Sequence, residues 1–330
     1  MLSTFLDRVS TLFNRRFLVS CWFPAFFALL LGLLPQVLAW GWAEAWRRWA
    51  QMSPAQGDAG IGSPQLWLLG GMLLLVSLVA YLLSVLARAV AHLYEGYAWP
   101  LFLRRRVTEC VRRRWERLRK ARAEAAGAGD TARYARLQER LHYEYPARAD
   151  LLLPTRLGNV LRAAEGYSGA VYGMDGPFWW PRLWPLLPEK QRDAVEDALA
   201  TMMAALNLAL LLVPVTVYAA VYLALCPIPW RGAWAVGAFL AGGLLFRLCY
   251  RGAVLQARAY GQQIRVSVDL YRSNLFPVLR LSLPSTPGEE RALWEKLSSW
   301  LYNTDLGAAW SLTYGSQEPS QPGPGGGEGA

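Results

Sequence analysis

The sequence predicts an all-α integral membrane protein with four transmembrane helices and a helical cytosolic module. Hydrophobic residues make up 54% of the 330 residues and charged residues only 18%, which is low for a soluble protein. Four apolar stretches are each long enough to cross a bilayer. Lys and Arg gather between the second and third stretches, where residues 92–203 contain 19 of them. Because cations favour the cytosolic side of a membrane, we expect this segment and both termini in the cytosol.

The N-terminal part is predicted to reach and then cross the membrane twice. Residues 1–16 carry apolar side chains at helical spacing and are expected to form an amphipathic interfacial helix. Residues 17–99 are expected to form a transmembrane hairpin, with spans at 17–40 and 66–87. A cleavable signal peptide is the rival interpretation, but the charged start and the apolar run are both too long for one.

Residues 100–153 are predicted to form a charged cytosolic helical hairpin. Ten Lys and Arg lie between residues 104 and 122, and Gly127 and Gly129 interrupt the helical pattern. Such a basic run can bind nucleic acid, but beside a membrane span anionic lipid headgroups explain it more simply. We therefore expect lipid headgroups as a partner, and we do not expect nucleic acid.

Residues 154–188 are predicted to form a turn-rich interfacial motif segment and are the candidate recognition site. Thr155 is the expected N-cap of a short helix, and glycines and prolines follow it. The expected structural and recognition network contains Arg156, Asn159, Arg162, Glu165, Asp175 and Arg182. The aromatic residues expected to anchor the chain at the membrane interface are Trp99, Trp179, Trp180 and Trp184.

The C-terminal half repeats the alternation of apolar and charged segments. Residues 189–250 are predicted to contain a long helix that enters a span at 203–225, followed by a span at 233–250. Small residues at Gly237, Ala238, Ala241 and Gly242 favour close helix packing in the fourth span. Packing of this span against the same span of another copy would form a homo-oligomer.

Beyond the fourth span, residues 251–314 are predicted to form cytosolic amphipathic helices. The last of these helices is expected to start at the capping box Thr286-Pro287-Gly288-Glu289. Residues 315–330 are rich in Gly and Pro and are expected to be a disordered tail.

Residues with potential for chemistry are few. His92 and Glu95 have the spacing of two metal ligands on one helix face, which His142 and Glu144 could complete, but an ordinary helix end at the membrane interface is the simpler explanation. The acidic residues Asp193, Glu196 and Asp197 suit the start of a helix through its dipole. We therefore expect no catalytic, cofactor-binding or metal-binding residues and no cofactor.

Several short motifs resemble a family of uncharacterised multi-pass membrane proteins that occurs mostly in high-GC bacteria. The matching segments are Arg16-Phe17-Leu18 through Phe23-Pro24, Leu93-Tyr94-Glu95-Gly96-Tyr97, Pro154-Thr155-Arg156-Leu157-Gly158-Asn159 through Glu165, Tyr172-Gly173-x-Asp175, and Trp180-Pro181-Arg182-Leu183. The resemblance covers most of the chain except the charged hairpin and the tail. It implies the bacterial inner membrane as the location but no known activity.

These observations predict a non-enzymatic inner-membrane anchor, sensor or scaffold that presents its cytosolic helices to a partner protein. One alternative is an oligomeric channel or membrane-perturbing effector, which the small residues of the fourth span favour. A second alternative is a membrane-embedded enzyme that acts on lipid, using His92 with Glu95, or Asp175.

Overall fold

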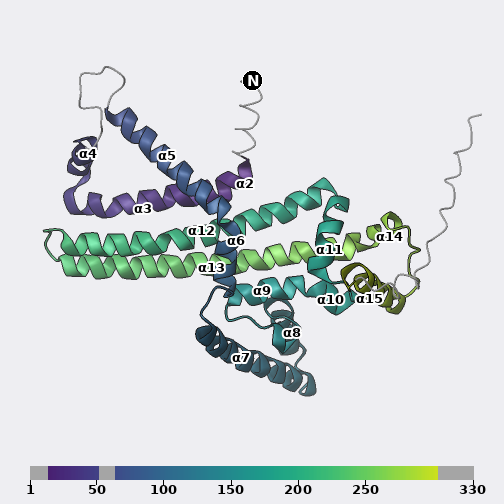
Figure 1. Ribbon diagram of the computed structural model, residues 1–330. Helices are drawn as coiled ribbons and strands as arrows, with labels where there is room; N and C mark the ends of the chain where they lie inside the picture. The colour runs from purple at the N-terminus through teal and green to yellow at the C-terminus, as the bar shows by residue number, and fades with distance from the viewer. Residues whose placement is uncertain (1–13, 52–63, 304–330) are drawn as a thin grey trace, which may run out of the picture. The chain divides into compact units, whose positions relative to one another are not determined.

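The computed structural model describes residues 14–51 and 64–303. Within these ranges the regular secondary structure is all helical (Figure 1). The predicted interfacial helix over 1–16 lies almost entirely outside the described residues, and the predicted tail over 315–330 lies wholly outside them.

The first half of the chain contains the helices α2 (Arg15–Phe17), α3 (Phe23–Trp40), α4 (Trp42–Gln51), α5 (Pro64–Val85), α6 (Ala87–Glu95), α7 (Leu101–Gly127) and α8 (Thr131–Glu144). The second half contains α9 (Arg156–Glu165), α10 (Tyr167–Tyr172), α11 (Gly176–Leu183), α12 (Glu189–Leu225), α13 (Arg231–Tyr271), α14 (Leu275–Val278) and α15 (Pro287–Asn303).

The chain divides into two compact units. Unit 1 contains residues up to Ala164 together with Asp193–Gln263, and unit 2 contains Glu165–Arg192 and the residues from Ile264 onward. The boundary falls inside the segment 154–188 that the sequence predicted as one motif segment. Because α9 belongs to unit 1 and α10 and α11 belong to unit 2, the two parts of that segment are described separately.

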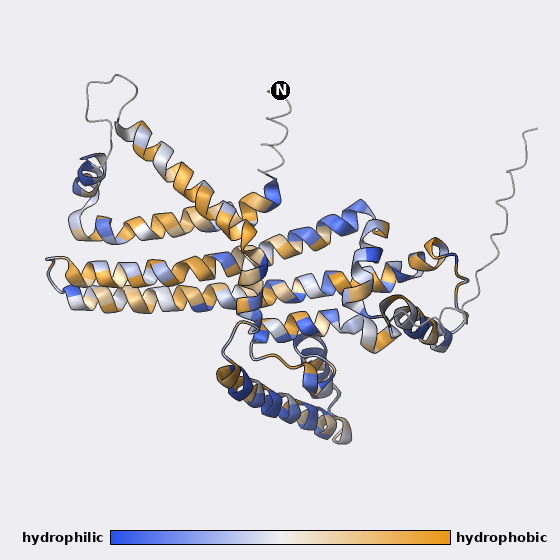
Figure 2. Ribbon diagram, in the orientation of Figure 1, coloured by the Kyte–Doolittle hydropathy of each residue, from blue (hydrophilic) through white to orange (hydrophobic). Residues whose placement is uncertain are grey.

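Within the described part of the chain, four helices are long and apolar enough to cross a membrane. They lie within Arg15–Trp40, Leu66–Val85, Glu189–Leu225 and Arg231–Val278, and their apolar stretches are coloured orange in Figure 2. These positions match the four predicted spans. The predicted long helix that enters the third span is confirmed, because α12 runs without interruption from its acidic start into the apolar stretch. The helix of the fourth stretch, α13, also continues beyond that stretch.

Small side chains allow the apolar helices of unit 1 to approach one another. A π-helical turn, Leu18–Trp22, places Cys21 in one buried cluster with Ala80 of α5, and α12 also packs against this cluster. Figure 1 shows α12 and α13 side by side, and a Cβ atom on Gly242 of α13 would overlap Thr216 of α12. Part of the small-residue stripe predicted in the fourth span is therefore used for packing within the chain.

The segment between the first two predicted spans contains a helix, α4, that was not predicted from the sequence. In α4, the ring of Trp42 stacks with that of Trp46 at 6.2 Å and meets that of Trp49 edge-on at 6.1 Å. The Arg48 guanidinium lies 3.9 Å from the centroid of the Trp40 ring. The ring contacts lie within α4, and the contact of Arg48 with Trp40 joins α4 to the end of α3.

The predicted charged hairpin is formed by α7 and α8. Trp115 of α7 packs with Leu141 of α8, and with Tyr145 and Leu152 that follow it, in a small core of its own. Asp130 caps α8 by accepting a hydrogen bond from the Arg133 N–H at 2.9 Å. Beyond its exposed apolar first turn, Leu101–Leu103, the surface of α7 is mostly hydrophilic (Figure 2).

Unit 2 has an aromatic core built from α11, α14, α15 and the end of α13. The fully buried rings of Trp179 and Trp294 lie 5.1 Å apart, and Phe276 lies 4.7 Å from Trp294. The predicted capping box starts α15, because Thr286 Oγ1 accepts from the Glu289 N–H at 3.2 Å and Glu289 accepts from the Ser285 N–H at 2.9 Å.

Candidate functional site

Two of the motif segments quoted above contact each other in unit 1. Gly96 ends α6 with a φ of +92°, and a Cβ atom there would overlap the ring of Pro154. A Cβ atom on Gly158 would lie 2.6 Å from the Glu95 carbonyl oxygen. Because both glycines permit a close backbone approach, the start of α9 packs directly onto the end of α6.

Hydrogen bonds fix this contact. The Thr155 hydroxyl accepts from the Gly158 N–H and donates to the Glu95 carbonyl, both at 3.0 Å, so the predicted N-cap is confirmed. Asn159 is 1% exposed. Its amide donates to the Leu153 and Thr155 carbonyls and accepts from the Leu153 N–H. Asn159 therefore holds the turn before α9, which is a structural role.

The buried carboxylate of Glu144, at the end of α8, forms ion pairs with three arginines from three helices. Its side chain is only 7% exposed. Arg156 of α9 lies 3.2 Å from it, Arg140 of α8 lies 3.6 Å from it, and Arg258 of α13 is in closer contact. We name these four residues the Glu144 cluster. It joins the hairpin to α9 and to α13.

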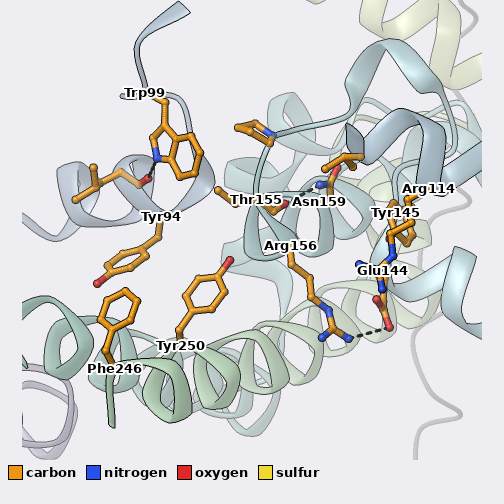
Figure 3. Close-up of a pocket in the computed structure, with 13 residues that line it drawn as sticks. Tyr94, Trp99, Arg114, Glu144, Tyr145, Thr155, Arg156, Asn159, Phe246 and Tyr250 are labelled. Atoms are coloured by element: carbon orange, nitrogen blue, oxygen red, sulfur yellow. Dashed lines mark hydrogen bonds and ion pairs between the residues drawn. The ribbon is translucent and has the colours of Figure 1, made fainter. Parts of the chain in front are cut away.

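A pocket of about 520 Å³ opens beside the Glu144 cluster (Figure 3). Tyr94 of α6 and Phe246 and Tyr250 of α13 form one side of it, whereas Arg114 of α7 and Arg156 lie on the other side. The volume falls within the range of small-molecule sites in proteins. The pocket thus has an aromatic side and a cationic side.

The aromatic side of the pocket is packed and partly polar. The rings of Tyr94 and Tyr250 stack with 6.1 Å between their centroids. Burial raises the pKa of Tyr94 to about 12, so its hydroxyl stays neutral near pH 7. Trp99 also lines the pocket, and its indole N–H donates to the Leu93 carbonyl at 3.1 Å.

A second ion-pair cluster in unit 1 has the opposite charge pattern. Arg16, at the start of the first apolar helix, lies 2.6 Å from Asp193 and 3.0 Å from Asp197 and is also paired with Glu196. We name these four residues the Arg16 cluster. The three acidic residues that the sequence assigned to a helix start thus bind one arginine 177 residues or more away in the chain.

The six predicted network residues are divided between the two units. Arg156 and Asn159 line the pocket, and Arg162 is half-buried elsewhere on α9. The other three belong to unit 2, where Glu165 and Asp175 are exposed. Arg182 is exposed too, with its guanidinium 4.0 Å from the Phe178 ring.

The predicted interface anchors differ in their exposure. Trp99 takes part in the pocket, and Trp180 and Trp184 are half-buried on unit 2. Trp179 is 0% exposed and donates a hydrogen bond to the Ser298 hydroxyl at 3.0 Å. Trp179 is therefore a core residue and presents no surface to a bilayer, in contrast to its predicted place at the interface.

Unit 2 contains a carboxylate held by neutral donors. The hydroxyls of Tyr172 and Tyr167 donate to Asp269 at 2.9 and 3.1 Å. Burial, followed by these bonds to Asp269, raises the pKa values of both tyrosines. Arg272 lies over the Tyr172 ring at 3.8 Å and pairs with Glu290 at 2.8 Å. This network links α10, α13 and α15.

The hypothetical metal ligands are not assembled. His142 is exposed, His92 contacts the Tyr97 ring at 5.7 Å, and Glu144 is engaged by arginines. Across residues 14–51 and 64–303, no group of three His, Cys, Asp or Glu side chains is placed to hold a metal ion.

Comparison with protein-family models, curated proteins and solved structures finds no match to this chain. The resemblance to a family of bacterial membrane proteins therefore stays a prediction.

Sequence analysis missed the central role of Glu144 and the existence of the pocket. A signal was present, since Glu144 is one of few acidic residues in a strongly basic segment and directly precedes Tyr145-Pro146, where α8 ends. Two of its three partners, however, lie 12 and 114 residues further along the chain.

Proposed function

We propose that this chain is a non-enzymatic, multi-pass protein of the bacterial inner membrane that presents its helical module to a cytosolic partner protein. Four apolar helices support the membrane part of this proposal. The concentration of cations between the second and third of them supports a cytosolic location of the module and both termini.

The observation that carries the proposal is the attachment of the hairpin to the fourth apolar helix. Arg258 lies on α13, in the continuation of that helix, and pairs with Glu144 at the end of the hairpin. Arg156 adds a second link through α9. These ion pairs hold the hairpin in one orientation relative to α13. A fixed orientation is needed if the hairpin is to present a binding surface to a partner.

The exposed side of α7 is the surface that we expect to be presented. Its exposed cations are Arg105, Arg106, Arg112, Arg113, Arg114, Arg117, Arg119 and Lys120. A dense positive surface attracts and orients a partner of negative charge. We therefore propose an acidic protein surface as the partner, with anionic headgroups contacting the end of α7 nearest the apolar helices.

Orientation in the membrane can be tested with Cys110, which is exposed on α7. In a variant with Cys110 as its only cysteine, a membrane-impermeant maleimide should label the protein only after the inner membrane is permeabilised. The matched control is Trp230→Cys in the loop between α12 and α13, where the side chain is 83% exposed. This site should react in spheroplasts, and labelling of Cys110 there would contradict the proposed topology.

Partner recruitment can be tested with two double variants of equal charge. Arg113→Gln with Arg117→Gln removes two exposed positive charges from α7, and Arg133→Gln with Arg136→Gln removes two from α8. Tagged protein is purified from gently solubilised membranes, and co-purifying proteins are quantified by mass spectrometry. We expect a stoichiometric acidic protein that only the α7 variant loses. Absence of such a protein, or equal loss in both variants, would overturn the proposal.

A further inference from the structure

The pocket beside Glu144 has an excess of positive charge. The four guanidinium groups at or next to it belong to Arg114, Arg140, Arg156 and Arg258, against the single carboxylate of Glu144. The formal charge of this group is therefore +3. Three of the arginines share the carboxylate, whereas Arg114 has no ion pair or hydrogen bond among the described residues. An anion would complete the site.

Donors for an anion lie on the same side of the pocket. Arg156 uses one Nη atom for Glu144 and is half exposed, so further guanidinium N–H groups remain for a ligand. Arg114 lines the pocket from α7. Guanidinium groups present a fork of N–H donors that matches phosphate oxygens.

The opposite side of the pocket would receive an apolar group. Its walls there are Leu93, Tyr94 and Phe246. Phe246 lies where the apolar stretch of α13 gives way to the charged residues Arg247 and Arg251, and the neighbouring Leu244 and Leu248 are more than half exposed. A chain that leaves the pocket on this side thus meets further apolar surface.

We propose that this pocket binds the phosphate head of an anionic amphiphile. Arg114 and Arg156 bind the phosphate oxygens, and the first part of the apolar chain packs against Tyr94 and Phe246. The ligand is either an anionic phospholipid of the bilayer or a single-chain alkyl phosphate, since both offer the same chemistry to the pocket. This inference does not depend on a protein partner.

The test uses the purified full-length chain in a neutral detergent. Thermal unfolding is followed while phosphatidylglycerol, dodecyl phosphate, phosphatidylcholine or inorganic phosphate is added, and the titration gives an apparent affinity. We expect saturable stabilisation by phosphatidylglycerol, by dodecyl phosphate, or by both, at concentrations where the other two have little effect. Stabilisation by phosphatidylglycerol alone identifies the bilayer as the source of the ligand.

Two variants of one helix separate a site from general attraction of anions. Arg114→Gln removes the pocket cation without an ion-pair partner, and we expect about tenfold weaker binding, because a charged hydrogen bond is lost. Lys120→Gln removes another exposed cation of α7 that does not line the pocket and lies away from the end of α7 proposed to contact headgroups, and it should bind as the unchanged protein does. Neither side chain is buried, so both variants should fold.

Three results would overturn the proposal. Equal weakening by the two variants would show unspecific electrostatic binding. Inorganic phosphate binding as well as the amphiphiles would show that the apolar side takes no part. Absence of any saturable stabilisation would show that the pocket is not a site for this class of ligand.

Discussion

The Glu144 cluster and the Arg16 cluster of unit 1 mirror each other in charge but differ in burial. In the first, one carboxylate that is 7% exposed binds three arginines. In the second, one arginine that is 27% exposed binds three acids that are 40–55% exposed. Each cluster has three ion pairs, so their number does not distinguish the two. Burial does, because water screens the exposed pairs and competes for their hydrogen bonds.

The largest effect is expected for Glu144→Gln. The substitution keeps the side-chain shape but removes the charge that three arginines share, and a broken buried ion pair costs on the order of 3 kcal/mol. Thermal or denaturant unfolding in detergent measures the loss. The control is Glu139→Gln, an exposed position on the same helix. A similar loss for both variants would show that burial does not decide the strength of the cluster.

Arg258→Gln should have a smaller effect. It removes the one partner that α13 contributes to Glu144 and leaves Arg140 and Arg156 in place. Loss of a hydrogen bond to a charged group predicts destabilisation by about 2 kcal/mol. Arg251→Gln, an exposed position on α13, is the matched control in the same unfolding measurement. An unchanged stability of Arg258→Gln would mean that α13 is held by packing alone.

Arg16→Gln should cost still less. Exposed ion pairs contribute about 0–1 kcal/mol each and weaken as salt rises. We expect a small loss of stability at low ionic strength that disappears at about 1 M salt. Arg15→Gln, at the exposed neighbouring position, should be neutral in both conditions. A loss as large as that of Glu144→Gln, or one that persists in high salt, would refute the comparison.

The smallest change in stability near neutral pH is expected when a hydroxyl that binds Asp269 is removed from unit 2. The pKa values of Tyr167 and Tyr172 are raised in the folded chain. The unfolded chain therefore loses these protons first, near a pH of about 10. Stability should fall as pH rises past that value and change little below it.

The comparison of unchanged protein with Tyr167→Phe tests this dependence by thermal unfolding at neutral and alkaline pH. Phenylalanine has no proton to lose, so the decrease at high pH should be smaller in the variant. Tyr134→Phe, at an exposed position on α8, is the control. An identical alkaline decrease in Tyr167→Phe and the unchanged protein would show that this network does not set the pH dependence.

The sequence alone determined the helical elements that depend on local pattern. The four apolar stretches, the hairpin of α7 and α8, the N-cap at Thr155 and the capping box at Thr286 are all present as predicted. Each rests on hydropathy, helical periodicity or a side chain that bonds its own backbone within a few residues. Such signals are complete within a short window of sequence.

Tertiary structure alone decided which residues meet. The contact of Gly96 with Pro154, the pairing of Glu144 with Arg258 and the burial of Trp179 all join residues far apart in the chain. A tryptophan of a hydrophobic segment has the same local pattern in a protein core as at a membrane surface. Its burial depends on what packs over it, here Trp294 of α15, and no local window of sequence contains that information.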